Sequence, residues 1–249
     1  MAELKFPSEI IDLPSKGILY PEGHPLKEGK VEMKYMTAKE EDILSNQSYI
    51  NKNIVLDKLL ESMIISPKID IKDLIIGDKN ALLIAARILG YGSKYTFTVG
   101  DKQTTVDLKT LDSKPLRTDL ITEGKNEIEF VLPQSENKIT FKFLTGHDEK
   151  KIDAELEGFK KINKDVSPEL TTRLKYMITS VEGNTDENAI RNFVDNYLLA
   201  MDSRALRDFY KEVMPDVDMS YEGEDGRFRN VSIGLTFFWP DLENSRLLS

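Results

Sequence analysis

Hydrophobic and polar residues alternate in several short stretches of the chain, and such alternation is typical of half-buried strands. In residues 30–36, Val31, Met33 and Tyr35 fall on one side of the expected strand. Two later pairs of stretches predict hairpins that could share one antiparallel sheet, and a third pair predicts a hairpin near the end. The expected strands of these hairpins are 95–99 with 103–108, 127–132 with 138–144, and 217–222 with 227–233.

Apolar residues at helical spacing predict helices around these strands. Thr37 and Glu40 match a capping box, in which both side chains satisfy backbone N–H groups at the start of a helix. We expect Asp78 to be the N-cap of a later helix and Gly90 to end it. The expected helices run through 41–44 and over 53–65, 78–89, 148–162, 168–181 and 185–214, the last interrupted near 201–204.

The first 29 residues contain proline or glycine every few positions, which interrupts regular secondary structure. The same segment is more apolar than a flexible tail, with Leu13 and Tyr20 among its hydrophobic residues. We therefore expect an irregular arm that packs either on its own domain or on a neighbouring protein.

Together these elements predict an α+β fold, in which helical units flank a small antiparallel sheet and a β hairpin follows at the end. The expected units are an arm (1–29), a strand with a helical unit (30–92), an antiparallel β region (93–146), a second helical unit (147–214) and a hairpin with an aromatic motif (215–249).

The composition narrows the chemistry that the protein could perform. Among 249 residues, 34 are Lys or Arg and 43 are Asp or Glu, so the formal charge is −9 and a nucleic-acid partner is not expected. The chain has no cysteine and only two histidines, His24 and His147, which excludes cysteine-ligated metals, thiol nucleophiles and disulfides. We expect no cofactor, no membrane span and a cytoplasmic site of synthesis.

His147, Asp148 and Glu149 are the candidates for catalysis, because a histidine beside two carboxylates can serve acid–base chemistry. The simpler interpretation is that this segment caps the helix that begins here, where acidic residues suit the helix dipole. The segment 90–92 (Gly-Tyr-Gly) is similar to part of a phosphate-binding loop, but a helix precedes it and a strand follows, the reverse of the nucleotide-binding order. The alternative hypothesis is an enzyme, namely a hydrolase that uses the carboxylates near His147.

The segment Phe237-Phe238-Trp239-Pro240 is the most unusual local feature and includes the only tryptophan. One interpretation is a core anchor for the terminal hairpin. The other is a patch that docks on a partner, because aromatic residues are enriched at the energetic centres of interfaces. Both interpretations can hold if some rings point inward and others outward.

Five groups of residues follow one another along the chain: Asp12-Leu13-Pro14-Ser15-Lys16-Gly17 with Tyr20-Pro21, the segment 34–44, the segment 141–145 with Asp148-Glu149, Asp202-Ser203-Arg204 with Leu206-Arg207, and the aromatic motif 237–240. In this order they resemble the baseplate hub and hub-assembly proteins of T-even-like contractile-tailed bacteriophages, over about residues 10–240. The resemblance implies a place at the baseplate, as a hub component or an assembly factor, and it supplies no catalytic residues to carry over. It also implies a hairpin similar to a zinc ribbon, but 219–226 lacks the paired cysteines that would hold the metal.

The favoured hypothesis is a non-enzymatic protein that binds other baseplate or tail proteins, with a second copy of itself as a further possible partner. It would be either a permanent part of the virion tail or a factor that acts in the host cytoplasm during assembly. Its expected interface residues are Leu13, Pro14, Tyr20 and Pro21 in the arm and Phe237, Phe238 and Trp239 at the other end.

Overall fold

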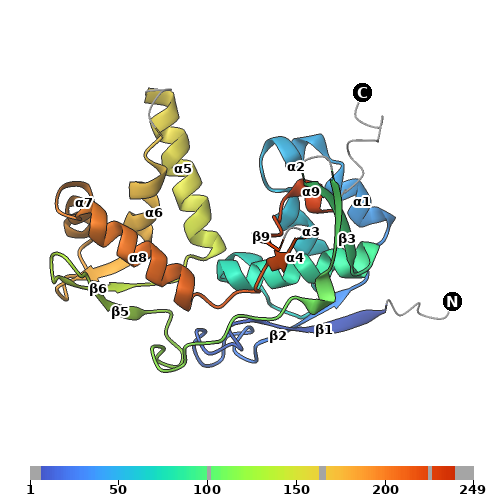
Figure 1. The fold of residues 1–249 in the computed structure, drawn as a ribbon, viewed down its shortest axis with the longest axis horizontal. Coiled ribbons are helices and arrows are strands. Elements are labelled where there is room, and N and C mark those ends of the chain that lie inside the picture. The colour runs from blue at the N-terminus through green and yellow to red at the C-terminus, as the bar shows by residue number, and fades with distance from the viewer. Residues whose placement is uncertain (1–6, 100–101, 163–166, 224–225, 239–249) are drawn as a thin grey trace.

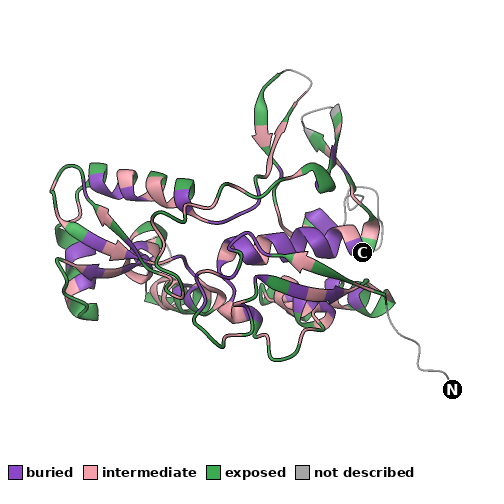
Figure 2. Ribbon diagram, turned by 90° about the horizontal axis from the view of Figure 1, so that it is seen from below, coloured by how far each residue is buried: buried purple, intermediate pink, exposed green. Residues whose placement is uncertain are grey.

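The computed structural model describes residues 7–99, 102–162, 167–223 and 226–238, and it forms two lobes that lie side by side (Figure 1). We call residues 8–111 and 217–238 the first lobe and residues 120–214 the inserted lobe, because the chain leaves the first lobe, builds the second and returns. The buried apolar side chains form two clusters, one in the first lobe and one in the inserted lobe, which Leu19 and Ile75 join. Buried residues occur in both lobes in Figure 2. The mixture of helices with small antiparallel sheets confirms the predicted α+β class.

The first lobe surrounds one long helix with small two-stranded sheets. Its strands are β1 (Ser8–Asp12), β2 (Lys30–Lys34), β3 (Lys94–Val99), β4 (Lys102–Asp107), β8 (Ser220–Glu222) and β9 (Phe228–Asn230). Its helices are α1 (Ala38–Leu44), α2 (Gln47–Asn51), α3 (Val55–Met63), η1 (Ile71–Asp73), α4 (Ile76–Tyr91), η2 (Leu108–Thr110) and α9 (Leu235–Phe238).

The arm is more regular than predicted, because β1 pairs with β2 in an antiparallel sheet. The segment between these strands is a series of tight turns, in which Gly17 and Gly29 both have positive φ. A Cβ on Gly17 would lie 2.1 Å from the backbone oxygen of Lys27, so only glycine allows this close approach. The arm therefore packs on its own domain.

Helix α4 forms the centre of the first lobe and is two residues longer at each end than predicted. Asp78 lies inside its first turn rather than at the N-cap, which is Ile75. The helix continues through Gly90, whose missing side chain makes room for Met36, and it is capped by Gly92 at φ 84°. The C-cap conformation, and not the first glycine in the sequence, decides where this helix ends.

The inserted lobe combines a three-stranded antiparallel sheet, in the order β5–β6–β7, with the helices that cover it. Its strands are β5 (Ile128–Val131), β6 (Lys138–Phe141) and β7 (Ile178–Val181). Its helices are α5 (Gly146–Ile162), α6 (Glu169–Met177), α7 (Glu187–Asn196) and α8 (Ala200–Val213).

Two predictions for this region are wrong. The two central hairpins do not share a sheet, because the extended segment after η2 carries the chain from β4 in the first lobe to β5 in the inserted lobe. The predicted helix 168–181 ends at Met177, and its last four residues form β7 on the edge of β6. The β-branched residues Ile178, Thr179 and Val181 favour a strand once an unpaired edge is within reach.

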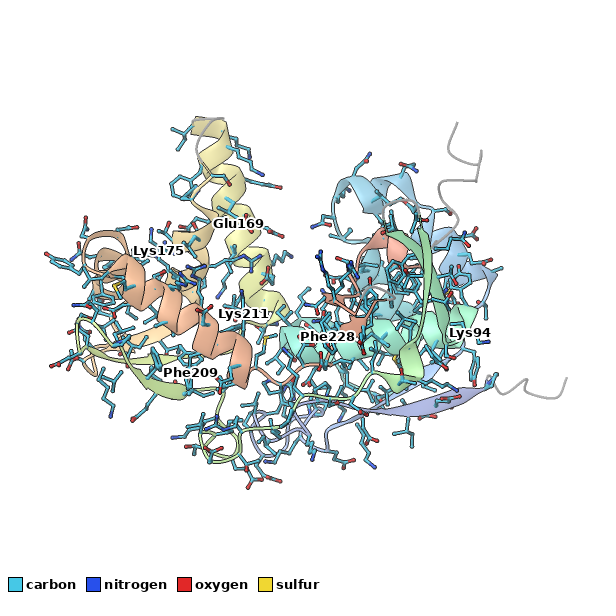
Figure 3. The ribbon with its side chains drawn as sticks, viewed as in Figure 1. Lys94, Glu169, Lys175, Phe209, Lys211 and Phe228 are labelled. Carbon is cyan, nitrogen blue, oxygen red and sulfur yellow. The ribbon has the colours of Figure 1, made fainter. Side chains whose placement is uncertain are left out.

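Helix α8 packs across the sheet and contributes aromatic side chains to the core of the inserted lobe. Phe209, which is labelled in Figure 3, stacks on Phe130 with 4.6 Å between ring centroids. It also makes an edge-to-face contact with Phe141. The break before α8 lies at residues 197–199, slightly earlier than predicted. In the first turn of α8, the buried carboxylate of Asp202 accepts hydrogen bonds from the backbone N–H groups of Gln134 and Ser135.

The lobes meet where α4 and α5 begin. The backbone N–H of Ile76 donates to the carbonyl of Leu144 at 3.1 Å, and that of Gly146 donates to the carbonyl of Leu74 at 3.2 Å. The returning chain passes so close to α4 that a Cβ on Gly77 would lie 1.7 Å from the backbone oxygen of Pro215. This junction is therefore a close-packed contact and not a loose linker.

Candidate functional site

The predicted interface residues of the arm are mostly part of the protein's own core. Leu13 and Tyr20 are buried in contact with the first cluster of apolar side chains, and Pro14 is buried beside them. Of the four predicted residues, Pro21 alone is exposed. This burial corrects the expectation that Leu13, Pro14 and Tyr20 form a contact surface, because their side chains are already removed from water within the same chain.

The two phenylalanines of the aromatic motif near the other end of the chain are also buried. Phe237 and Phe238 are fully buried, and the ring of Phe237 lies 4.9 Å from that of Tyr95 in an edge-to-face contact. Trp239, the third predicted residue of this motif, lies outside the described residues. For the two phenylalanines the core-anchor interpretation holds, and they offer no free docking surface.

The proposed catalytic acids do not converge on one site. Asp148 accepts from the backbone N–H of Thr145 at 3.0 Å and pairs with Lys142 at 2.7 Å. Glu149 forms a bidentate pair with Arg173, at 2.7 and 2.9 Å. Each carboxylate therefore has its own structural partner. The hydrogen bond to Asp148 agrees with the capping interpretation, whereas the ion pair of Glu149 links α5 to α6.

The two histidines of the chain do converge, on a carboxylate that sequence analysis did not single out. Nε2 of His24 lies 3.4 Å from Oδ2 of Asp73, and Nε2 of His147 lies 3.2 Å from Oδ1 of the same side chain. His24 comes from the arm, Asp73 from η1 and His147 from the first turn of α5. These groups border a pocket of about 190 Å³ at the junction of the lobes.

A chain of polar contacts leads from this pocket into the interior. Tyr20 stacks on His24 with 5.3 Å between ring centroids, and its hydroxyl donates to Asp78 at 2.7 Å. Asp78 also accepts from the hydroxyl of Ser15 at 2.6 Å and from its backbone N–H at 2.9 Å. Burial raises the pKa of Asp78 to about 6, although these three hydrogen bonds favour the charged form.

The same burial raises the pKa of the Tyr20 hydroxyl, and the charge of Asp78 raises it further. A buried carboxylate with a raised pKa is often a catalytic group. Here, however, Asp78 is fully buried and its oxygens are occupied by donors from the arm. Its geometry suits an anchor that fastens the arm to α4, and no substrate could reach it.

No group of three or more metal-ligating side chains suited to an ion occurs among the described residues. The same part of the chain contains no helix long and apolar enough to cross a membrane.

A larger pocket, of about 540 Å³, lies between the arm and the segment that leads to the inserted lobe. Lys16, Lys30 and Lys114 line it together with Asp12 and Glu28. Lys30 and Asp12 are 3.6 Å apart and compensate one another. The mixture of charges at this pocket does not define a ligand.

A third feature lies at the far end of the inserted lobe, in the turn between α7 and α8. We call Tyr197, Leu199 and Met201 the apolar corner; their exposed fractions are 63%, 46% and 69%. Asp202 ties the start of α8 to the β5–β6 turn, so the backbone beneath the corner is held in place. The sequence signal for it is the apolar run 197–201, which precedes the predicted helix break and is equally typical of a core segment.

Comparisons with protein-family models, with curated proteins and with solved structures find no match to this chain.

Proposed function

We propose that this protein is a non-enzymatic tail protein of a contractile-tailed bacteriophage, and that it binds other baseplate or tail proteins. The order of its sequence motifs supports the phage assignment. The apolar corner is the observation that carries the binding function, because apolar side chains grouped on an ordered surface are characteristic of interaction sites.

The apolar corner replaces the buried chain ends as the proposed contact surface. Tyrosine and methionine are both enriched at interfaces, and tyrosine is one of the residues that most often dominate their binding energy. Removing one such side chain from water is worth about 1.5–3 kcal/mol. Three neighbouring side chains could therefore supply the anchors of an interface of ordinary size, about 1,600 Å² in total.

The hydrolase alternative has no supporting geometry among the described residues. Asp148 and Glu149 are held by Lys142 and Arg173, so neither is poised to act on a substrate. The enzyme hypothesis would need a measured hydrolytic activity that is lost in His147→Gln while assembly persists.

The test is to replace Tyr197 and Met201 together by serine and to measure tail assembly and co-purification of tail proteins from infected cells. Because both side chains are exposed, we expect the variant to melt within a few degrees of wild type but to lose its partners. The matched control is Ile162→Ser, which removes an even more exposed apolar side chain elsewhere on the same lobe. Normal assembly by the double variant would refute the corner as the contact surface.

The two modes of action, permanent component and assembly factor, are distinguished by mass spectrometry of purified virions. A component remains in mature particles at a fixed copy number, whereas an assembly factor occurs only in extracts and precursors. Complete independence of tail assembly from this protein would refute the proposed function itself.

A further inference from the structure

The contact of His24 and His147 with one carboxylate joins three segments that belong to different parts of the fold. Asp73 lies in η1 beside the start of α4, His24 in the arm and His147 in the inserted lobe. The side chains are 35%, 22% and 51% exposed, so water and protons reach all three. The arrangement places two imidazoles, the kind of side chain that can gain a proton in mildly acidic solution, at the contact between the lobes.

The hydrogen bonds of His24 fix its protonation state in this structure. The backbone N–H of Leu26 donates to Nδ1 of His24 at 3.2 Å, so Nδ1 must carry no proton. The neutral ring then has its proton on Nε2, the nitrogen that faces Asp73. A second proton on this ring would bring two N–H groups face to face and break the contact with Leu26.

His147 has no such constraint. Its Nε2 faces Asp73, and no hydrogen bond to its Nδ1 is found among the described residues. Protonation of His147 keeps the existing contact and converts it to an ion pair, which is stronger than a neutral hydrogen bond. His147 also lies in the first turn of α5, where the helix dipole disfavours a positive charge, so the imidazolium depends on Asp73 for compensation.

Several other carboxylates of these segments have donors of their own. In η1, Asp70 accepts from the backbone N–H of Lys72. Lys27 of the arm pairs with Glu123 of the inserted lobe, and Asp78 of α4 accepts from Ser15 and Tyr20. In α5, Asp148 and Glu149 pair with Lys142 and Arg173. Asp73 is therefore the carboxylate available to an imidazolium at position 147.

We propose that His147 and Asp73 form a proton-controlled latch between the two lobes, closed by an ion pair in mild acid and weakened to a neutral contact in mild alkali, with neutral His24 holding Asp73 in position. The two histidines have different roles. Protonation strengthens the contact of His147 with Asp73, whereas protonation of His24 would break its hydrogen bond from Leu26. The latch does not depend on the proposed function.

A double-mutant cycle tests the latch, with His147→Gln, Asp73→Asn and the combined variant compared with wild type by urea unfolding at pH 5.5 and pH 8. We expect a coupling between the two side chains at pH 5.5 that falls severalfold at pH 8. The pH dependence of Asp78 is common to all four proteins and cancels. The matched cycle of His24→Gln with Asp73→Asn should show no such gain at low pH.

A second measurement reports on the lobes directly. Because the chain has no cysteine, Lys94→Cys and Lys211→Cys provide unique spin-label positions, one on each lobe (Figure 3). The distance distribution should be narrower at pH 5.5 than at pH 8, and His147→Gln should abolish the difference. Equal widths at both pH values, or a coupling that does not change with pH, would overturn the proposal.

Discussion

The guanidinium of Arg87 donates from Nε to the backbone carbonyl of Phe237 at 3.0 Å, which joins residues 150 positions apart in the sequence. Arg87 also donates to the carbonyl of Gly92 at 3.1 Å and lies over the rings of Tyr91 and Tyr95. Burial lowers the pKa of Arg87. The last described helix is thus held by a buried cation as well as by its own aromatic side chains.

Replacing Arg87 by methionine should destabilise the protein by about 2–3 kcal/mol, because the carbonyls of Gly92 and Phe237 would lose charged donors inside the protein. Urea unfolding measures this loss. Arg204→Met is the matched control: that side chain is 80% exposed and lies 3.8 Å from Asp208, so its loss should cost less than about 0.5 kcal/mol. Equal effects of the two substitutions would contradict the role of Arg87.

Phe238→Ala should cost about 3–5 kcal/mol, because it opens a cavity at a fully buried site in the first lobe. Phe228→Ala removes the same ring from β9, where the side chain is 73% exposed, and should change stability by no more than about 0.5 kcal/mol. Thermal unfolding of the two variants compares them. A small effect at position 238 would show that α9 is not part of the core.

Asp78 should make the protein less stable as the pH rises from about 4 to about 7. Its pKa is about 6 in the folded protein and near 3.8 when unfolded, so in this range the folded state binds more protons. The contribution is fully present below pH 3.8 and is lost as the pH passes through 6, by about 3 kcal/mol in total. Unfolding free energies at several pH values should show this slope in wild type and not in Asp78→Asn, whose side chain is neutral at every pH.

Glu40 should have the opposite effect on the pH dependence of stability. Burial alone would raise its pKa, but hydrogen bonds from Lys34, Ser62 and Thr37 outweigh it and lower the pKa to about 2. The stability that this carboxylate contributes is therefore present above pH 4.5 and is lost as the pH falls through 2. Comparing acid unfolding of wild type with Glu40→Gln measures the difference, and identical acid profiles would contradict the prediction.

Gly77→Ala should destabilise the junction of the lobes, because the new Cβ would meet the backbone oxygen of Pro215 and the returning chain would have to move. Gly158→Ala is the matched control. It is also a helical glycine, in α5, and a Cβ there would meet nothing within 4 Å. That substitution should raise stability by about 0.5–1 kcal/mol, as expected for alanine in a helix. We expect thermal unfolding to show that Gly77→Ala lowers the stability of the protein and that Gly158→Ala raises it.

Local patterns predicted much of the secondary structure. The capping box of Thr37 and Glu40 is present at α1, and the helix predicted over 148–162 is found as α5. Both depend on neighbours in the sequence, which is why the sequence was sufficient. The predicted helix 168–181 failed in its last turn, since the edge of β6 that pairs with residues 178–181 is distant in the sequence.

The candidate sites were harder to predict, because each depends on residues that only the fold brings together. Asp73 and Asp78 carry no motif, yet one receives both histidines and the other anchors Ser15 and Tyr20. An apolar residue in a Pro/Gly-rich arm or an aromatic motif is equally suited to a core and to an interface. The turns at Gly17 and Gly29 fold the arm back on its own lobe, and this decides between the two for Leu13.

The insertion of one lobe within the other has a consequence for synthesis. A ribosome completes α4 long before it makes Phe237, which Arg87 and Tyr95 contact, and the whole inserted lobe emerges in between. During synthesis the nascent first lobe therefore exposes an apolar surface that Phe237 covers only after the inserted lobe has been made. A chaperone or an early binding partner that shields this surface would raise the yield of folded protein.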